Sequence, residues 1–438
     1  MQLAYRIPPN RAQAGTRAAK WINPEKNELL IPTREAAYAQ ITALEKQLKG
    51  PLTKHRRAEV LIARAMIFEA LGTPKMLEAA QDAWKATKTA ITAHLMAVAY
   101  HHLGDLKTAC SYYEQAYRYP HEAGFNIDLA YTQALLFQGK WAEAHKMTLG
   151  LKKRMVYAAY LPEWDGQHTR KLSIISEGGF GDIIHTGRWI PVIRNMGIEA
   201  TVYLPPYFFE HGFVDLMRRQ PWTPEVKLLT ETPQNIPAVG FFDLPAKFDV
   251  RPDTIPPSLT FEPCPKKVAT FGHILENVRK RPIIGICWAA RAMETPLVPC
   301  GVYRSLCEQQ TEKILNETGK GIHFVSLQFG EGEKFPNLLV PEIKSWEDTA
   351  AIIANLDAVV TVDTAVMHLA AAMGKPVYLL LSGASDWKFG LTDTRCRWYP
   401  NIRIFRNNAF GFDHAVESLI EFLSAQFKHH PIPDSSVL

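Results

Sequence analysis

Residues 358–381, AVVTVDTAVMHLAAAMGKPVYLLL, constrain the fold of this chain more than any other stretch. The β-branched run at 359–362 is typical of a buried parallel strand, and after Asp363 the pattern becomes helical. Thr364 is a natural N-cap for that helix, and Gly374 is a natural end to it. The apolar letters that follow predict another strand. Strand, helix and strand in this order form a βαβ unit, which requires a parallel sheet and places the helix N-terminus at the carboxyl end of the first strand.

The turn at Asp363 and Thr364 has the chemistry of an anion site. Free backbone N–H groups and the positive end of the helix dipole favour a phosphate at a helix N-terminus, and the same donors would stabilise a diphosphate leaving group. Because a carboxylate repels phosphate, Asp363 suits a ribose or sugar hydroxyl, or an ammonium-bearing partner. A purely structural interpretation also accounts for the segment, since Asp363 ends a strand, Thr364 caps a helix and His368 would be a satisfied core histidine.

A second strand, glycine-rich turn and helix are predicted between residues 171 and 196. The turn contains Gly179, Gly181 and Asp182, but it lacks the third glycine of a dinucleotide fingerprint. An acid in the first turn of the helix also argues against a bound pyrophosphate at this position. The glycines would instead let the loop approach a ligand closely and present the carboxylate of Asp182 over a cleft. The alternative is that Asp182 merely complements the helix dipole.

These two motifs carry a family resemblance. Asp-Thr-x-x-x-His-Leu-x-x-Ala-x-Gly-x-Pro-Val, starting at Asp363, resembles the nucleotide-sugar motif of glycosyltransferase family nine, the heptosyltransferase-like enzymes. Gly-Asp followed by Ile, at 181–183, resembles their amino-domain motif. The resemblance covers roughly residues 171–425, and the whole chain looks most like bacterial proteins that join tetratricopeptide repeats to such a domain. It implies an α/β fold class in which an all-α repeat domain precedes a GT-B pair of Rossmann-like domains facing each other across a cleft.

The resemblance also implies roles for individual residues. It implies that the donor is bound by Asp363, Thr364, Ala365, His368, Arg291, Arg304, Gln328 and Asp348. It implies that Gly179, Gly181, His185 and Arg188 lie on the acceptor side and that Asp182 is the general base. The two donor-side arginines are the available cations for the diphosphate, because a guanidinium can bind it in bidentate fashion. Structural alternatives remain for some of them: Asp348 fits the first turn of a capped helix, and each arginine fits an ordinary surface position.

Before the α/β region the chain is predicted to be helical. Gly104 lies 32 residues after Gly72 and 35 before Gly139, and each glycine follows an alanine-rich helical pattern. This spacing resembles tetratricopeptide repeats and predicts about three degenerate helix pairs. We therefore predict five parts: a basic extended arm (1–33), helical repeats (34–160), an acceptor-side Rossmann-like domain (167–270), a nucleotide-sugar domain (281–410), and a closing helix with a tail (411–438).

Charge and cysteine usage add bulk constraints. The net charge of +5 does not by itself demand a polyanionic partner, but residues 1–57 hold eleven Lys and Arg against four Glu and no Asp. That segment fits nucleic acid, an anionic membrane surface or an acidic partner, or else a solvated helical face. The six cysteines form no CxxC pair, which suggests reduced thiols. With no signal-like start and no run of 18 apolar residues, we expect a cytoplasmic protein without a membrane span.

The resemblance to glycosyltransferase family nine implies an enzyme that moves a sugar from a nucleoside diphosphate donor to an acceptor hydroxyl, with inversion at the anomeric carbon. No Asp-x-Asp occurs in the chain, so we expect no metal that bridges the protein and the donor diphosphate. We also expect no cofactor, because the nucleotide sugar is a co-substrate. The acceptor is a glycan, a lipid, a protein or a modified base in DNA, and the repeats offer a surface for a protein partner. The rival from another class is a non-catalytic binding module on a transferase fold. A phosphate-dependent epimerase is a more remote alternative.

Overall fold

The structure is a computed structural model, which describes residues 22–23, 28–29, 34–121, 125–150, 161–176, 178–290, 304–318, 321–330, 335–383, 385–407 and 411–427 of the 438-residue chain. Most of the predicted arm therefore lies outside the described residues. Within it, β1 (Ile22–Asn23) pairs with β2 (Glu28–Leu29) in antiparallel fashion.

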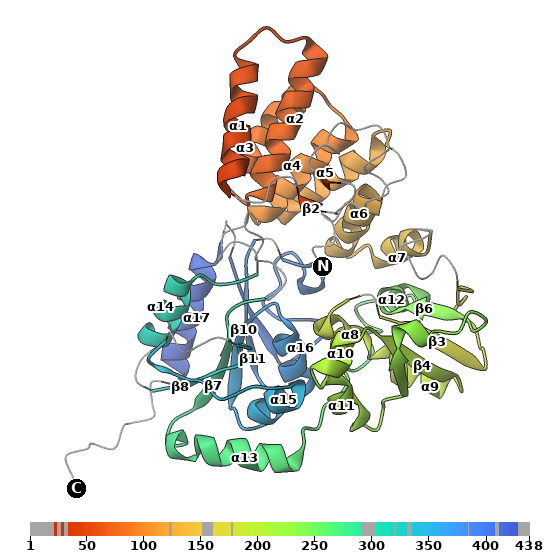
Figure 1. Cartoon of the computed structure of the whole chain (residues 1–438), viewed down its shortest axis with the longest axis vertical. Coiled ribbons are helices and arrows are strands. Elements are labelled where there is room, and N and C mark those ends of the chain that lie inside the picture. Colours follow the sequence, from red (N-terminus) through yellow and green to blue (C-terminus); the bar gives the residue numbers. More distant parts are fainter. Residues whose placement is uncertain are drawn as a thin grey trace, which may run out of the picture.

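The N-terminal region consists of helices that pack in antiparallel pairs (Figure 1). They are α1 (Arg34–Leu48), α2 (Lys54–Ala70), α3 (Lys75–Ala86), α4 (Ala90–His102), α5 (Leu106–Arg118), α6 (Phe125–Phe137) and α7 (Trp141–Gly150). Gly72, Gly104 and Gly139 follow α2, α4 and α6, each with a positive φ that favours glycine. Buried alanines such as Ala83 and Ala97 let the helices approach closely. The helical region is as predicted, and its assignment to tetratricopeptide repeats stays a prediction.

The first α/β domain is built on a four-stranded parallel sheet of order β5-β4-β3-β6. Its strands are β3 (Lys171–Ile175), β4 (Glu199–Leu204), β5 (Glu225–Leu228) and β6 (Ala238–Gly240). Its helices are α8 (Phe180–Thr186), α9 (Trp189–Asn195), α10 (Tyr207–Glu210), α11 (Phe213–Arg218) and α12 (Leu244–Lys247), with 3-10 turns at η4 (Leu229–Glu231) and η5 (Phe241–Asp243). In the register of the central strand, Ile174 lies between Val202 and Val239. These side chains are buried because helices cover the sheet.

The second α/β domain has a six-stranded parallel sheet of order β12-β11-β10-β7-β8-β9. Its strands are β7 (Ile283–Cys287), β8 (His323–Ser326), β9 (Leu338–Leu339), β10 (Ala358–Val362), β11 (Val377–Leu381) and β12 (Ile402–Arg406). Its helices are α14 (Glu308–Glu317), α15 (Trp346–Ala354), α16 (Ala365–Ala372) and α17 (Asp413–Gln426), with a 3-10 turn at η7 (Trp387–Phe389). Helix α13 (Pro265–Leu275) and the turn η6 (Glu276–Val278) connect the two domains, and α13 packs on α15.

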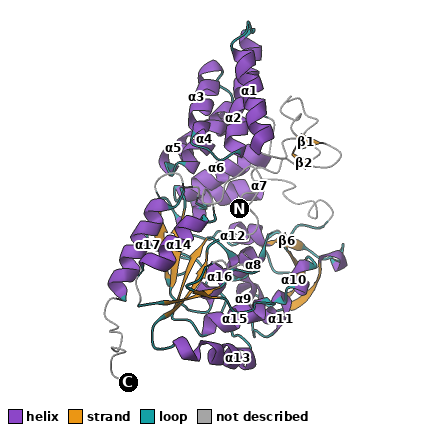
Figure 2. Cartoon of the chain, turned by 60° about the vertical axis from the view of Figure 1, so that its left-hand side comes forward, coloured by secondary structure: helices purple, strands orange, loops and turns teal. Residues whose placement is uncertain are grey.

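The central unit β10-α16-β11 has the predicted order and parallel pairing, and every residue of β10 is buried. The two parallel sheets and the helical N-terminal region confirm the predicted fold class, a GT-B pair of Rossmann-like domains preceded by helices. Figure 2 shows the helical region lying at one end of the pair, with both sheets below it.

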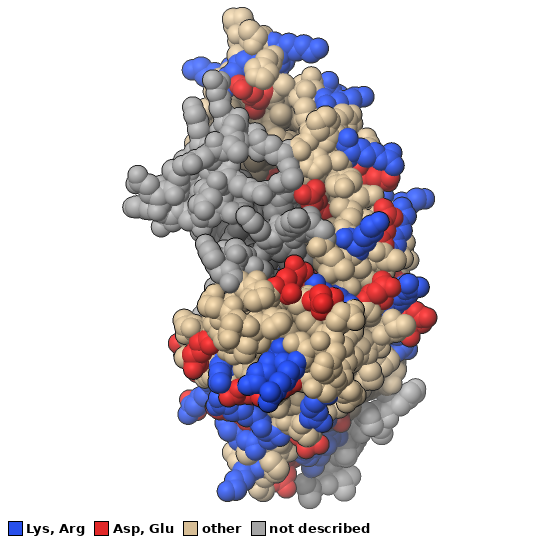
Figure 3. All heavy atoms as spheres, turned by 90° about the vertical axis from the view of Figure 1, so that its right-hand side faces the viewer, with Lys and Arg blue, Asp and Glu red and all other residues tan. Residues whose placement is uncertain are grey.

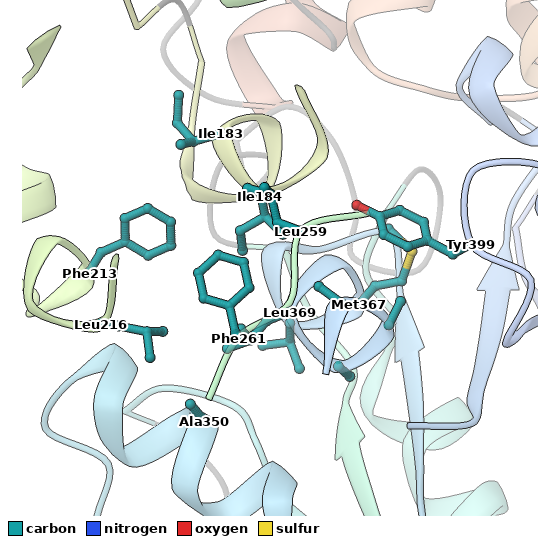
Figure 4. Packing of buried hydrophobic residues seen from close by; sticks show 14 of the residues in the cluster. Ile183, Ile184, Phe213, Leu216, Leu259, Phe261, Ala350, Met367, Leu369 and Tyr399 are labelled. Atoms are coloured by element: carbon teal, nitrogen blue, oxygen red, sulfur yellow. The ribbon is translucent and has the colours of Figure 1, made fainter. Parts of the chain in front are cut away.

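The two α/β domains share one apolar core across their junction (Figure 4). Ile184 and Leu216 come from the first domain, and Met367 and Leu369 come from the second. Polar contacts reinforce this packing, since Arg219 forms an ion pair with Glu347 at 3.1 Å and the Trp346 N–H donates to the His211 carbonyl at 3.1 Å. The cleft between the domains is therefore closed on one side by packed side chains.

Candidate active site

The N-termini of α8 and α16 meet across the domain junction. Gly179 precedes α8 and Thr364 precedes α16, both in extended backbone conformation. The two helices approach so closely at Gly181 that a Cβ atom there would lie 2.9 Å from Cδ2 of His368 and 3.2 Å from Cα of Ala365. The two motifs singled out in the sequence, which are some 180 residues apart, thus face each other.

A cavity of about 490 Å³ lies beside this contact and is lined by both α/β domains. Nine of the predicted residues line it: Gly179, Gly181, Asp182, Arg304, Gln328, Asp363, Thr364, Ala365 and His368. It opens at the carboxyl ends of β7, β8 and β10, where ligands of open α/β sheets bind. The volume lies within the range of ordinary small-molecule pockets.

Asp182 presents its carboxylate to the cavity from the first turn of α8. Its Oδ2 accepts a hydrogen bond from the Gly179 N–H at 2.8 Å, so the side chain also caps the helix. Among the described residues, Oδ1 has no hydrogen-bond partner. Asp182 therefore lies in the first turn, as the helix-dipole alternative expected, and its Oδ1 remains to act as an acceptor in the cavity.

Asp363 is buried on the opposite side of the cavity between two cations. Its Oδ1 lies 3.6 Å from Nζ of Lys388, its Oδ2 lies 3.7 Å from Nε of Arg304, and its backbone carbonyl accepts from Arg304 Nε at 3.1 Å. Burial alone would raise the pKa of Asp363, but these two cations outweigh it and hold the pKa well below its ordinary value. Asp363 is thus an ionised group that keeps both cations at the floor of the cavity.

Lys388 also lines the cavity and was not predicted from the sequence. It lies on η7, its side chain is only 11% exposed, and its Nζ lies 3.8 Å from Asp386 as well as close to Asp363. Burial alone would lower the pKa of Lys388, but the two carboxylates reverse the effect and raise it. Their place in the sequence could have identified these residues. Asp386 and Lys388 follow strand β11, which is parallel to β10, so both strands end at the same edge of the sheet.

His368 is buried in the second turn of α16, where Nδ1 lies 3.1 Å from the Tyr399 hydroxyl. Burial lowers the pKa of His368 well below its ordinary value, and the nearby charge of Lys388 lowers it further. The imidazole is therefore neutral near pH 7 and packs as the structural alternative expects, while one edge lines the cavity. Gln328 is also tied locally, since its Oε1 accepts from the Ala289 N–H at 3.0 Å.

Three more of the predicted residues, His185, Arg188 and Asp348, are described and do not line the cavity. Arg188 is 1% exposed and its guanidinium lies over the rings of Trp398 and Tyr399, at 5.2 and 4.9 Å from their centroids. His185 is buried against the Trp398 ring, at 4.6 Å between centroids. Both are buried at the domain junction, His185 in the last turn of α8 and Arg188 at the N-cap of α9. The acceptor-side role expected for them has no support in this geometry.

Asp348 also points elsewhere, since it forms an ion pair with Lys267 and accepts hydrogen bonds from the Lys344 N–H at 3.0 Å and the Ser345 hydroxyl at 3.1 Å. These contacts match the capping alternative rather than donor binding. Arg291 lies outside the described residues.

Within the part of the chain that the structure describes, no cluster of three His, Cys, Asp or Glu side chains is arranged to hold a metal. No helix among the described residues has the length and apolar character needed to cross a bilayer.

One protein-family model matches the part of the chain that contains several residues of this site. Residues 328–407 match the model of glycosyltransferase family 9 (heptosyltransferase). The chain is 26% identical over 283 residues to Protein FlbA of Caulobacter vibrioides, a match that covers 57% of this chain and 45% of FlbA. The chain thus spans less than half the length of this curated relative.

Two solved structures are similar to part of the chain. The glycosyl transferase family 9 protein from Veillonella parvula has 12% identity and a TM-score of 0.43, with 61% of this chain and 99% of that chain covered. The E. coli ADP-heptose lps heptosyltransferase II has 14% identity and a TM-score of 0.42, with 59% and 99% covered. The family match at 328–407, which includes the turn at Asp363 and Thr364, confirms the resemblance to glycosyltransferase family 9 (heptosyltransferase) stated from the sequence.

Proposed function

We propose that this chain transfers a sugar from a nucleoside diphosphate donor to a hydroxyl group of an acceptor. The observation that carries the proposal is the shared cavity into which Asp182 and the N-terminus of α16 both open. Further support comes from the family match over residues 328–407. One side of the cavity presents a carboxylate, and the other presents backbone donors and cations. This is the division of charge that displacement of an anionic leaving group requires.

In this proposal the donor diphosphate binds at the N-terminus of α16. The backbone N–H groups after Thr364 and the positive charges of Arg304 and Lys388 favour a dianion there. These groups would also stabilise the negative charge that grows on the departing nucleoside diphosphate. Because the helix N-terminus and the side-chain donors of Arg304 and Lys388 can contact the diphosphate directly, we propose that the reaction requires no divalent cation. Activity that persists in excess EDTA is the expected result.

Asp182 is the proposed general base. Its carboxylate would take the proton from the acceptor hydroxyl as the oxygen attacks the anomeric carbon, while the C–O bond to the diphosphate breaks on the far side. Because attack and departure occur on opposite faces, the product would have inverted configuration. The anomeric configuration of the product by NMR is the measurement that decides between inversion and retention.

A thermal-shift panel of nucleoside diphosphates and their sugars tests the proposal directly. A ligand that binds only the folded state raises the melting temperature by mass action, so the panel would identify the base. A panel without any stabilising nucleotide would argue against a donor site. Loss of turnover in Asp182→Asn would then separate an enzyme from the non-catalytic binding module that the sequence also allows.

The acceptor is proposed to be a glycan, lipid or protein hydroxyl, with a modified DNA base as the alternative. The excess of Lys and Arg in residues 1–57 is the observation that favours DNA. On the face shown in Figure 3, basic and acidic side chains are mixed, which does not by itself favour a polyanion. A steep salt dependence of duplex binding that disappears on deletion of residues 1–57 would identify DNA as the acceptor.

A further inference from the structure

The turn that carries Lys388 into the cavity is also held by the helical region. Trp387 packs edge-on against Trp141 of α7, with 5.8 Å between ring centroids and an interplanar angle of 89°. Trp141 in turn stacks on Trp398, at 5.6 Å and 10°. Two consecutive residues of η7 therefore have different surroundings: the indole of Trp387 lies against the helices, and the ammonium of Lys388 lies in the cleft.

Contacts from α4 and from the turn that follows it hold the segment just before η7. The ring Nε2 of His101 lies 2.9 Å from the carbonyl oxygen of Ser385, within hydrogen-bond distance. At Gly383 the two backbones touch directly, because a Cβ atom there would lie 2.7 Å from the Gly104 nitrogen and 2.8 Å from the His102 carbonyl oxygen. No side chain fits between the helical region and this segment.

From the transferase side, Arg406 of β12 holds the same turn. Its guanidinium donates to the Ser385 hydroxyl and to the Phe389 carbonyl, both at 2.8 Å. The turn is thus clamped between the α/β domain and the helices. Since a lysine side chain reaches only as far as its backbone allows, the position of the Lys388 ammonium depends on both clamps.

We propose that the helical-repeat domain is part of the donor site, because it positions Lys388 to bind the diphosphate of the donor. This inference rests on the proposed function and assigns two roles within it. Lys388 contacts the diphosphate, and His101, Gly104 and Trp141 are positioning residues that act through the turn. It follows that displacement of the helices by a bound partner would change donor affinity without any new contact to the donor.

Calorimetric titration of the full chain with ADP, UDP and GDP, and with the matching nucleosides, tests the first role. We expect Lys388→Met to weaken the best-binding diphosphate by about tenfold to a hundredfold, as for loss of a charge-assisted contact, while binding of the matching nucleoside is unchanged. Lys388→Arg should restore most of the diphosphate affinity. Equal losses for nucleoside and diphosphate would mean that the variant disturbs the fold rather than a phosphate contact, and would overturn this role.

Gly383→Ala tests the second role, because the added methyl group pushes the helices away from the turn. We expect about a tenfold loss of diphosphate affinity and no loss for the nucleoside. His101→Phe, which removes the contact to Ser385 without adding bulk between the backbones, should give a smaller loss of the same kind. Gly50→Ala is the matched control, since the nearest atom to its new Cβ is the Gln47 carbonyl oxygen at 3.5 Å; it should bind like the wild type.

The outcomes separate the two proposals. If the wild-type chain binds no nucleoside diphosphate, the proposed function fails and this inference fails with it. If the wild type binds one tightly and folded Gly383→Ala and His101→Phe bind it equally well, the helices do not position Lys388 and only this inference is overturned.

Discussion

Gly181 of α8 and Ala365 of α16 lie so close across the domain junction that a Cβ atom on Gly181 would be 3.2 Å from Cα of Ala365. The same atom would be 2.9 Å from the His368 ring, which is itself buried. The contact brings the proposed base and the proposed phosphate site to opposite sides of one cavity. Backbone atoms of Ala365 as well as the His368 ring crowd this position, so a small shift of the ring would not make room for a Cβ atom.

Replacing this glycine should open the cleft. We expect Gly181→Ala to lower the free energy of unfolding by about 1–3 kcal/mol, as overpacking does in a close-packed interior, and to increase the radius of gyration in small-angle scattering. Gly179→Ala is the control from the same turn, because the nearest neighbour of its Cβ would be Asp182 Oδ2 at 3.9 Å. A compact, fully stable Gly181→Ala protein would contradict the tight junction.

Asp182→Asn should remove the base and keep the fold. The amide oxygen of Asn can still accept the hydrogen bond from the Gly179 N–H, so helix α8 stays capped. We expect turnover to fall by about 10²–10⁴, the usual contribution of a general base, with an unchanged melting temperature and an unchanged Kd for the donor. Unaltered turnover would assign the carboxylate to capping alone.

Asp363 should make stability depend on acid pH. Burial favours the protonated form, but Lys388 and Arg304 dominate and lower the pKa of the folded carboxyl. The ion pairs therefore stabilise the fold fully above the ordinary Asp pKa of about 4, and this stabilisation declines as the pH falls below that value towards the folded pKa. We expect Asp363→Asn to lower the free energy of unfolding by about 3–5 kcal/mol at pH 7, as when one partner of a buried pair is removed.

Denaturant titrations at pH 7 and pH 3 measure this dependence. The difference between wild type and Asp363→Asn should shrink at pH 3, whereas exposed Asp215→Asn should differ little from the wild type at either pH. A difference that is the same at both pH values would show that Asp363 stabilises the fold by packing rather than by charge.

Arg188 should be a stability residue rather than a substrate contact. Its guanidinium donates to the His185 carbonyl at 2.8 Å and the Pro256 carbonyl at 3.1 Å, and it lies over two aromatic rings. We expect Arg188→Met to lower the free energy of unfolding by about 2–4 kcal/mol, because the carbonyls lose their partner and the cation–π contacts disappear. Exposed Arg194→Met is the control, with a change of about 1 kcal/mol or less. Chemical denaturation followed by tryptophan fluorescence is the measurement.

Phe329 should contribute to nucleobase binding. It lies in the loop after β8, lines the cavity and is 55% exposed, which is unusual for so large an apolar side chain. If the base stacks on this ring, Phe329→Ala should weaken both the nucleoside and its diphosphate by about tenfold, and Phe329→Tyr should not. Equal binding of the nucleoside by Phe329→Ala and the wild type would exclude stacking on this ring.

The sequence by itself determined the local parts of this protein. The β-branched run at 359–362, Thr364 at the N-cap position and the stop at Gly374 specify β10-α16-β11 through propensities that act within a few residues. The Thr364 side chain itself makes no capping hydrogen bond and instead contacts Thr361 and Cys287. The glycines at 72, 104 and 139 likewise mark helix ends because each adopts a positive φ. The family resemblance rested on such contiguous motifs, and it was confirmed over residues 328–407.

Only the tertiary structure decided which side chains share a cavity. Arg188 and Asp348 were expected to bind substrate, but packing at the domain junction and an N-cap account for them. Lys388 was not expected in the cavity, and it lies there because a turn 25 residues beyond Asp363 is clamped by helices from the other end of the chain. The physical reason is that propensities and caps act over a few residues, whereas burial and charge pairing depend on contacts between segments that are distant in the sequence.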